Sequence, residues 1–278
     1  MIHTSRQLKA LVRNRSNGNS AQAQTIIRNF IMERFLERIS LSKYRDHFIL
    51  KGGMLVSALV GLENRATMDI DTTIKNLPLS VDDVTDIITE IIKVAVEDGI
   101  TFSIKRVFEI MDEAEYPGVR AMLEAELDSM RTPLKIDIST GDVITPKEIE
   151  FSYQLMFENR SISIYAYNIE TVLAEKIETV ISRGIANTRL RDFYDLYILQ
   201  QERKSDIDYE KVKMALAATS QKRQSEDIMQ RGNYILEQVY QNEEMQKLWK
   251  NYQHKFAYAD GISWDAVMHS IKELYKHI

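Results

Sequence analysis

The sequence predicts an α+β protein in which a mixed sheet with flanking helices is followed by an all-helical C-terminal region. Between residues 48 and 167, segments rich in β-branched residues alternate with helical patterns and turn signals. From Ile169 to Ile278, apolar residues recur almost only at helical spacing, and Trp249 and Trp264 are expected to anchor the core there. We therefore expect two domains, residues 1–168 with N-terminal helices and the sheet, and residues 169–278 with helices alone.

Two helices are expected ahead of the sheet. The first covers Gln7–Asn14, and the turn-like Ser16-Asn17-Gly18 follows it. Either Asn19 or Ser20 can cap the second helix. The apolar residues of this second helix recur at helical spacing and are Ile26, Ile27, Phe30, Ile31, Phe35, Leu36 and Ile39.

The sheet is expected from five segments with strand-like patterns, which are Thr67–Ile74, Ile100–Ile110, Val119–Leu127, Leu134–Ser139 and Ser161–Tyr167. Phe48–Leu50 fits either a further strand or the end of a helix, and the Gly52-Gly53 break after it leads into a short helix, Met54–Val60. Ser80 starts a capping box ahead of another helix. Glu115-Tyr116-Pro117-Gly118 is a turn signal between two of the strands.

The composition excludes several kinds of site. The chain of 278 residues contains no cysteine, which rules out disulfides, thiolate catalysis and cysteine-ligated zinc or iron–sulfur centres. No apolar run is long enough to span a bilayer, and residues 1–20 lack the apolar stretch of a signal peptide. We expect a cytoplasmic protein that does not enter a membrane.

The net charge of −5 conceals an uneven distribution along the chain. Residues 1–51 contain ten Lys or Arg and three Asp or Glu, whereas residues 69–150 contain eight and 19. The basic segment has two interpretations. Arg28, Arg34 and Arg38 either solvate a helix face on which Glu33 and Glu37 pair with them, or form an entry surface for a polyanion such as RNA.

Three carboxylates suggest a site for a divalent cation. Asp69 and Asp71 stand two residues apart on a predicted strand, so both side chains project from the same face. Asp137 lies on another predicted strand, with its flanking isoleucines directed to the core. If the strands are neighbours, three carboxylates meet at one edge, an arrangement that a hard ion such as Mg²⁺ accepts. Gly52-Gly53, leading into a helix, would let backbone N–H groups approach a triphosphate.

The motif LKGGM followed by TMDID resembles the nucleotidyltransferase superfamily of polymerase-beta type, and more narrowly the AbiEii/AbiGii toxins of abortive-infection, type IV toxin–antitoxin systems. The resemblance covers about half of the chain, between Gly52 and Leu196. It rests on four motifs, which are Gly52-Gly53 with Arg65, Asp69 and Asp71; Lys135-x-Asp137; Ala174-Glu175-Lys176; and Arg189-x-Arg191-Asp192-x-x-Asp195-Leu196.

The resemblance implies a minimal nucleotidyltransferase fold and a pyrophosphate-releasing transfer from a nucleoside triphosphate, with Mg²⁺ or Mn²⁺ as cofactor. Asp69, Asp71 and Asp137 would bind the metal, and Gly52 and Gly53 would cradle the phosphates. The positive charge around the triphosphate would come from Lys176 and Arg191, together with Lys51 and Arg65. The carboxylates that would orient these cations or the acceptor are Asp192 and Asp195.

The chain departs from the family pattern at three places. Many relatives have Gly-Ser where this chain has Gly52-Gly53, so any role of that serine hydroxyl is excluded here. The family's acid ahead of the helix lysine falls on Thr171, and Glu170 or Glu175 remains an alternative for it. Arg191 stands where lysine is common, which keeps the charge but changes the geometry.

The partners implied are a nucleoside triphosphate, an RNA acceptor such as a tRNA 3′ end, and a cognate antitoxin encoded nearby that forms no stable complex with the toxin. A small molecule of aminoglycoside type or a protein hydroxyl is the alternative acceptor. A non-catalytic binding module with the same fold is the alternative from another class.

Overall fold

The computed structural model of the chain describes residues 2–111 and 117–278. The chain forms two compact units. The first comprises Met1–Ala58, Ala66–Asp142 and Ile149–Ala166, and the second comprises Leu59–Arg65, Val143–Glu148 and Tyr167–Ile278. Each unit is therefore built from segments that are separated in the sequence, and each is described here by itself.

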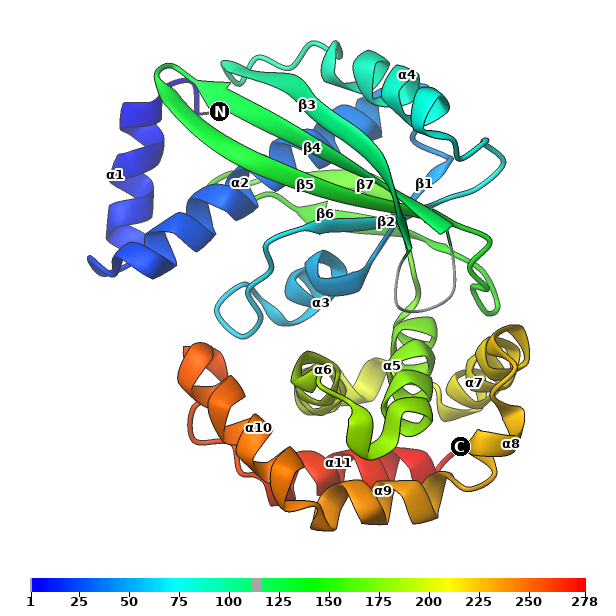
Figure 1. Cartoon of the computed structure of the whole chain (residues 1–278). Helices are drawn as coiled ribbons and strands as arrows, with labels where there is room; N and C mark the ends of the chain where they lie inside the picture. Colours follow the sequence, from blue (N-terminus) through cyan, green and yellow to red (C-terminus); the bar gives the residue numbers. More distant parts are fainter. Residues whose placement is uncertain (1, 112–116) are drawn as a thin grey trace. The chain divides into compact units, whose positions relative to one another are not determined.

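The first unit contains a mixed sheet of seven strands in the order β3-β4-β5-β2-β1-β7-β6 (Figure 1). Its strands are β1 (Phe48–Lys51), β2 (Ile70–Ile74), β3 (Ile100–Met111), β4 (Pro117–Leu127), β5 (Met130–Thr140), β6 (Ile149–Gln154) and β7 (Ser161–Ala166). The pairs β2–β5 and β1–β7 are parallel, whereas the other neighbouring strands are antiparallel. The predicted α+β class with a mixed sheet is confirmed.

Several strand boundaries differ from the prediction, and the largest difference is at β5, which begins at Met130 and not at Leu134. Phe48–Lys51 is a strand, which resolves the open alternative. The strand expected from Thr67 begins only at Ile70, so Asp69 precedes it. The edge strand Ile149–Gln154 was not predicted, although Ile149, Phe151 and Tyr153 alternate with polar residues along it. The predicted turn at Glu115-Tyr116 lies outside the described residues.

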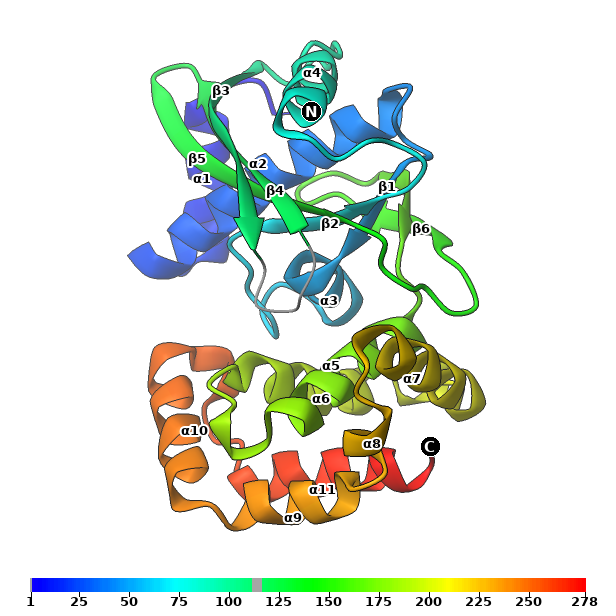
Figure 2. The same cartoon turned by 45° about the vertical axis from the view of Figure 1, so that its right-hand side comes forward.

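Two helices of the first unit begin at polar caps that the sequence suggested. Asn19 caps α2 (Ser20–Leu41) by accepting a 3.0 Å hydrogen bond from the Gln22 N–H, and Ser80 caps α4 (Val81–Ile92) in the same way. The other two helices are α1 (Ser5–Arg15) and α3 (Gly52–Val60). Helix α2 packs against β5 and β7, and α4 packs against β3 and β4, so these two helices cover the sheet (Figures 1 and 2).

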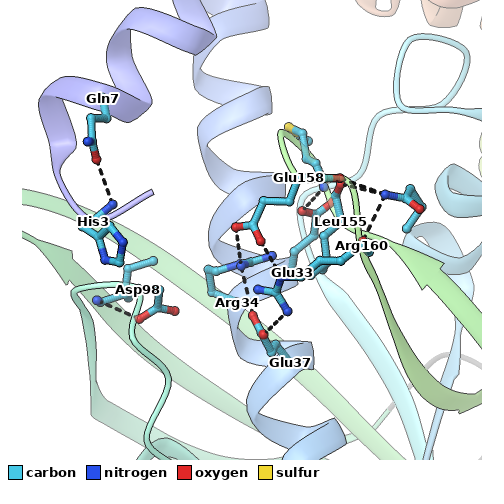
Figure 3. Close-up of polar contacts among 12 residues, drawn as sticks. His3, Gln7, Glu33, Arg34, Glu37, Asp98, Leu155, Glu158 and Arg160 are labelled. Atoms are coloured by element: carbon cyan, nitrogen blue, oxygen red, sulfur yellow. Dashed lines mark hydrogen bonds and ion pairs between the residues drawn. The ribbon is translucent and has the colours of Figure 1, made fainter. Parts of the chain in front are cut away.

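Two of the three arginines of α2, Arg34 and Arg38, are buried, which corrects both interpretations for these two residues, whereas Arg28 is half-buried. The side chain of Arg34 is 0% exposed and lies 3.0 Å from Glu37 and 3.1 Å from Glu158 (Figure 3). Arg38 forms two hydrogen bonds of 2.8 and 2.9 Å with the carboxylate of buried Asp98. These arginines therefore neither solvate a helix face nor reach a polyanion. The exposed cations of this segment include those of α1, which are Arg6, Lys9, Arg13 and Arg15.

Glu33 gives the stability of the first unit a specific pH dependence. Burial raises the pKa of this carboxyl from 4.5 to about 7, although the Met156 N–H, Arg34, Tyr153 and Arg15 act in the opposite direction. The folded protein then holds a proton that the unfolded chain releases. This contribution is complete below pH 4.5, decreases as the pH rises and is lost above pH 7.

We expect the Glu33→Gln variant to lack this contribution. Relative to the variant, the wild-type protein should lose about 3 kcal/mol of unfolding free energy between pH 4.5 and 7. Urea denaturation of both proteins at several pH values measures the difference. The variant subtracts the titration of all other groups, so parallel pH profiles would contradict the buried, protonated Glu33.

The second unit consists of helices. They are α5 (Ile169–Arg183), α6 (Leu190–Glu202), α7 (Tyr209–Arg223), α8 (Glu226–Met229), α9 (Gly232–Gln241), α10 (Glu243–Lys255) and α11 (Trp264–Lys276). Trp249 and Trp264 are 1% and 7% exposed and lie with ring centroids 6.1 Å apart, so their predicted role in the core is confirmed. Among the described residues, no helix is both long and apolar enough to cross a membrane.

Candidate active site

A row of four charged residues crosses the middle of the sheet. Lys51 on β1 is opposite Asp71 on β2, Asp71 is opposite Asp137 on β5, and Asp137 is opposite Arg120 on β4. Residues opposite each other on neighbouring strands share a face of the sheet. The sheet register therefore places two carboxylates side by side, with a cation on each outer side.

The two outer cations are engaged with different carboxylates. Arg120 forms a bidentate pair with Asp137, with distances of 2.6 and 2.8 Å. Lys51 donates a 2.6 Å hydrogen bond to Asp142, in the loop after β5. Burial would raise the pKa of Asp142, but the charge and hydrogen bond of Lys51 outweigh it, so the pKa lies below its usual range. The pKa of Asp71 is shifted in the opposite direction. Burial and the neighbouring charges of Asp137 and Asp69 raise its pKa, against the weaker effects of Lys51 and the Gly53 N–H.

The glycine turn lies directly against Asp71. Gly52 adopts a φ of +63° and begins α3, so this helix starts at the glycines and not after them as predicted. A Cβ atom at Gly52 would lie 2.2 Å from Asp71 Oδ2, and the Gly53 N–H donates a 3.3 Å hydrogen bond to the same oxygen. Only glycine at position 52 permits both the backbone conformation and this close approach.

Asp69 is linked to the other carboxylates through a lysine. The Lys135 Nζ lies 2.6 Å from Asp69 Oδ2 and 3.7 Å from Asp137 Oδ2. The predicted pattern of three carboxylates meeting directly is thus modified, since a cation separates Asp69 from Asp137.

The donor set matches a hard divalent cation in its chemistry. Three carboxylates on adjacent segments supply oxygen ligands, the kind that such an ion prefers. Within residues 2–111 and 117–278, however, no group of three His, Cys, Asp or Glu side chains is placed to hold a metal ion. Lys135, Asp69, Arg120 and Asp137 have side chains that are 21–30% exposed, and ion pairs with such solvent access are weak enough to be exchanged.

The second unit contains a buried cluster built from the other predicted residues. The Lys176 Nζ on α5 lies 2.9 Å from Asp192 and 2.7 Å from Asp195, both on α6. Arg65 binds the same Asp195 through Nε at 2.6 Å and Nη2 at 3.2 Å, and its side chain is 1% exposed. Burial would raise the pKa of Asp195, but the charges of Arg65 and Lys176 outweigh it and the pKa is lowered. Burial alone would lower the pKa of Lys176, but the charges of Asp192 and Asp195 outweigh this effect, so the pKa is raised.

The remaining predicted residues lie apart from this cluster. Arg191 is exposed on α6, with its Cζ 5.9 Å from the ring centroid of Phe256. Of the three alternatives for the third-motif acid, Thr171 bonds to the backbone of Thr145 and Glu170 accepts from the Asp208 N–H. Glu175 lies 3.8 Å from Arg223.

Sequence reasoning missed one member of the charged row, Arg120, and the partner of another, Asp142. Arg120 was not singled out, because its role depends on the register between β4 and β5. Asp142 was not singled out either, although it accepts a hydrogen bond from Lys51. A weak signal existed for Arg120, since it is a lone cation among apolar residues at the start of a strand.

A mixed sheet that brings an acidic pair against a glycine turn at a helix start defines a protein of nucleotidyltransferase type. The family model described as nucleotidyl transferase AbiEii toxin, type IV toxin–antitoxin system, matches residues 34–270. The chain therefore belongs to the AbiEii family, as the four sequence motifs predicted.

Solved structures that match this chain include a candidate nucleotidyltransferase from H. pylori, with 14% identity over 91% of this chain and 95% of that one and a TM-score of 0.49. JHP933 from Helicobacter pylori matches with 15% identity over 91% and 92% and the same TM-score, 0.49. An antigenic nucleotidyltransferase-like protein from Paracoccidioides brasiliensis matches with 14% identity over 81% and 93% and a TM-score of 0.38. No match was found among curated proteins. The family assignment thus rests on the family model.

Proposed function

We propose that this AbiEii-family protein transfers a nucleotide from a nucleoside triphosphate to an RNA hydroxyl, such as a tRNA 3′ end, in a Mg²⁺-dependent reaction in the cytoplasm. The observation that carries the proposal is the acidic pair Asp71 and Asp137 on adjacent strands, in contact with the start of α3 through Gly52 and Gly53. As in its family, an antitoxin encoded nearby controls the toxin, without a stable complex between the two.

Asp69, Asp71 and Asp137 are the proposed metal ligands. A divalent cation bound there would supply Lewis-acid stabilisation for the charge on the triphosphate. The start of α3 directs backbone N–H groups at an anion, and Lys51 adds positive charge at the edge of the acidic row. These features support binding of a triphosphate beside the carboxylates.

The proposed transfer forms one bond and breaks one. The acceptor hydroxyl oxygen forms a bond to the α-phosphorus, while the bond from that phosphorus to the bridging oxygen breaks and pyrophosphate leaves. Asp137 accepts the proton of the hydroxyl. The second unit carries two further proposed phosphate-binding cations, Lys176 and Arg191, and within that unit Asp192 and Asp195 orient Lys176. Arg65 holds the Asp195 carboxylate in place through a buried ion pair.

Exposed cations on α1 favour RNA over a small molecule as the acceptor. Arg6, Lys9, Arg13 and Arg15 are exposed, and residues 1–32 contain no acidic residue. Such a cationic helix suits a phosphate backbone and is unnecessary for an aminoglycoside, which is itself cationic.

Labelled nucleoside triphosphates test the acceptor directly. Each of the four is incubated with the protein, Mg²⁺, total RNA, total protein and an aminoglycoside, and the products are separated. We expect the label in RNA only, with release of one pyrophosphate per nucleotide transferred. Label in the drug or in protein would select the alternative acceptors, and no label anywhere would favour a non-catalytic module.

A further inference from the structure

A pocket of about 360 Å³ lies in the second unit, between the start of α6 and the end of α10. Its lining includes Arg189 and Arg191 from the start of α6, and Asn251, Tyr252, Lys255 and Phe256 from the end of α10. The two helices pack against each other, so the pocket belongs to one compact unit. Its volume is in the range of sites that bind small molecules or single nucleotides.

The pocket lining contains an aromatic ring, that of Phe256, with two cations near it. The ring of Phe256 lies 5.9 Å from the Arg191 Cζ and 5.5 Å from the Lys255 Nζ. It is half-buried, and its position is fixed by Tyr252 and Tyr258, whose ring centroids lie 4.7 and 5.4 Å away. A ring held in this way is a rigid surface on which another planar group can stack.

The positive charge of the pocket is available to a ligand. Within the part of the chain that the structure describes, Arg191 and Lys255 form neither a hydrogen bond nor an ion pair. The one lining carboxylate, Asp192, is already bound by Lys176 at 2.9 Å and lies 3.2 Å from the Arg189 Nε. Helix α6 also begins without a side-chain cap, although the Asp192 N–H in its first turn donates a 3.0 Å hydrogen bond to the Arg189 carbonyl oxygen.

We propose that this pocket binds the terminal nucleotide of a single-stranded RNA, with the base on the Phe256 ring and the adjacent phosphate between Arg191 and Lys255. A ring flanked by separate cations suits a base joined to a phosphodiester. A metal-bound triphosphate suits it less, because Asp192 is neutralised and no other lining residue is acidic. This inference rests on the proposed function, since it places the acceptor strand, and it assigns Arg191 to that strand.

Binding is measured without catalysis, so that the two proposals fail separately. A fluorescein-labelled single-stranded RNA of about eight nucleotides is titrated with the full-length protein by anisotropy, without nucleoside triphosphate or Mg²⁺. We expect Phe256→Ala to weaken binding at least about fivefold, and Phe256→Tyr, which keeps the ring, to change it less than about twofold. Arg191→Ala should weaken binding and reduce the slope of log affinity against log salt by about 1.

Lys250→Ala is the matched control, because Lys250 is an exposed cation of α10 outside the pocket lining. It should bind RNA as the wild-type protein does. Wild-type RNA affinity in both Phe256→Ala and Arg191→Ala would overturn the inference. It would also be overturned if a nucleoside triphosphate alone displaced the RNA and Phe256→Ala lost triphosphate affinity to the same extent. Normal RNA binding by a protein that transfers no nucleotide would overturn only the proposed function.

Discussion

Asp71→Asn is expected to lower the rate of nucleotide transfer by roughly 10²–10³-fold without destabilising the protein. The carboxylate lies between Asp137 and the glycine turn, where its own charge is disfavoured by burial and by neighbouring acids. Asparagine keeps the size of the side chain and its acceptor for the Gly53 N–H, but it removes the charge that a metal ligand needs. Removing this charge also relieves repulsion, so thermal stability in EDTA should be unchanged or increased.

Initial rates of labelled nucleotide incorporation and thermal unfolding curves measure the two effects. Asp86→Asn is the matched control, because Asp86 is an exposed carboxylate on α4 of the same unit. Its rate should equal that of the wild-type protein. A fully active Asp71→Asn variant would refute the catalytic assignment, and a variant that unfolds would show that Asp71 has a structural role.

Asp195→Ala is expected to destabilise the second unit by about 3–5 kcal/mol. The Asp195 carboxylate is 0% exposed and is the shared partner of Arg65 and Lys176, whose positive charges would remain buried without it. Its lowered pKa has the same origin, so the stability that it contributes is present above the usual aspartate range and is lost as the pH falls.

Urea denaturation at neutral pH measures this cost. Asp206→Ala is the matched control, since Asp206 pairs with Arg203 in a bridge whose side chains are 44% and 39% exposed. Such a pair contributes about 0–1 kcal/mol. Equal destabilisation by the two substitutions would mean that the buried cluster contributes no more than a surface pair.

Much of the fold follows from apolar spacing. Alternating apolar residues identified Ile100–Met111 and Pro117–Leu127 within one or two residues of their ends. In the second of these strands the alternating residues form a buried face, which consists of Val119, Ala121, Leu123, Ala125 and Leu127. The edge strand Ile149–Gln154 was missed although it alternates in the same way, and it buries only Tyr153.

The acidic pair of the candidate site could be anticipated, but its surroundings could not. Asp71 and Asp137 stand out because each interrupts an apolar strand pattern, and the parallel register of β2 and β5 then brings them together. Their partners depend on contacts between distant segments. Arg65 binds Asp195 across 130 residues, and Arg34 reaches Glu158 across 124.

Charged residues are the class for which sequence was least informative. Arg34 and Arg38 are residues of the type expected on a solvated helix face. Burying them costs free energy, and their ion pairs with Glu37 and Asp98 offset this cost. Sequence alone does not reveal those partners, because Asp98 lies 60 residues from Arg38 along the chain and Glu158 lies 124 residues from Arg34.

Binding of a divalent cation by the acidic row tests the central claim most directly. Mn²⁺, whose free form gives an electron paramagnetic resonance signal, is titrated into the wild-type protein and into the Asp71→Asn and Asp86→Asn variants, with a non-hydrolysable nucleoside triphosphate present. We predict that the wild-type protein and Asp86→Asn bind Mn²⁺ equally and that Asp71→Asn binds it at least about tenfold more weakly. Equal Mn²⁺ affinity in all three proteins would contradict a metal-dependent site at Asp71.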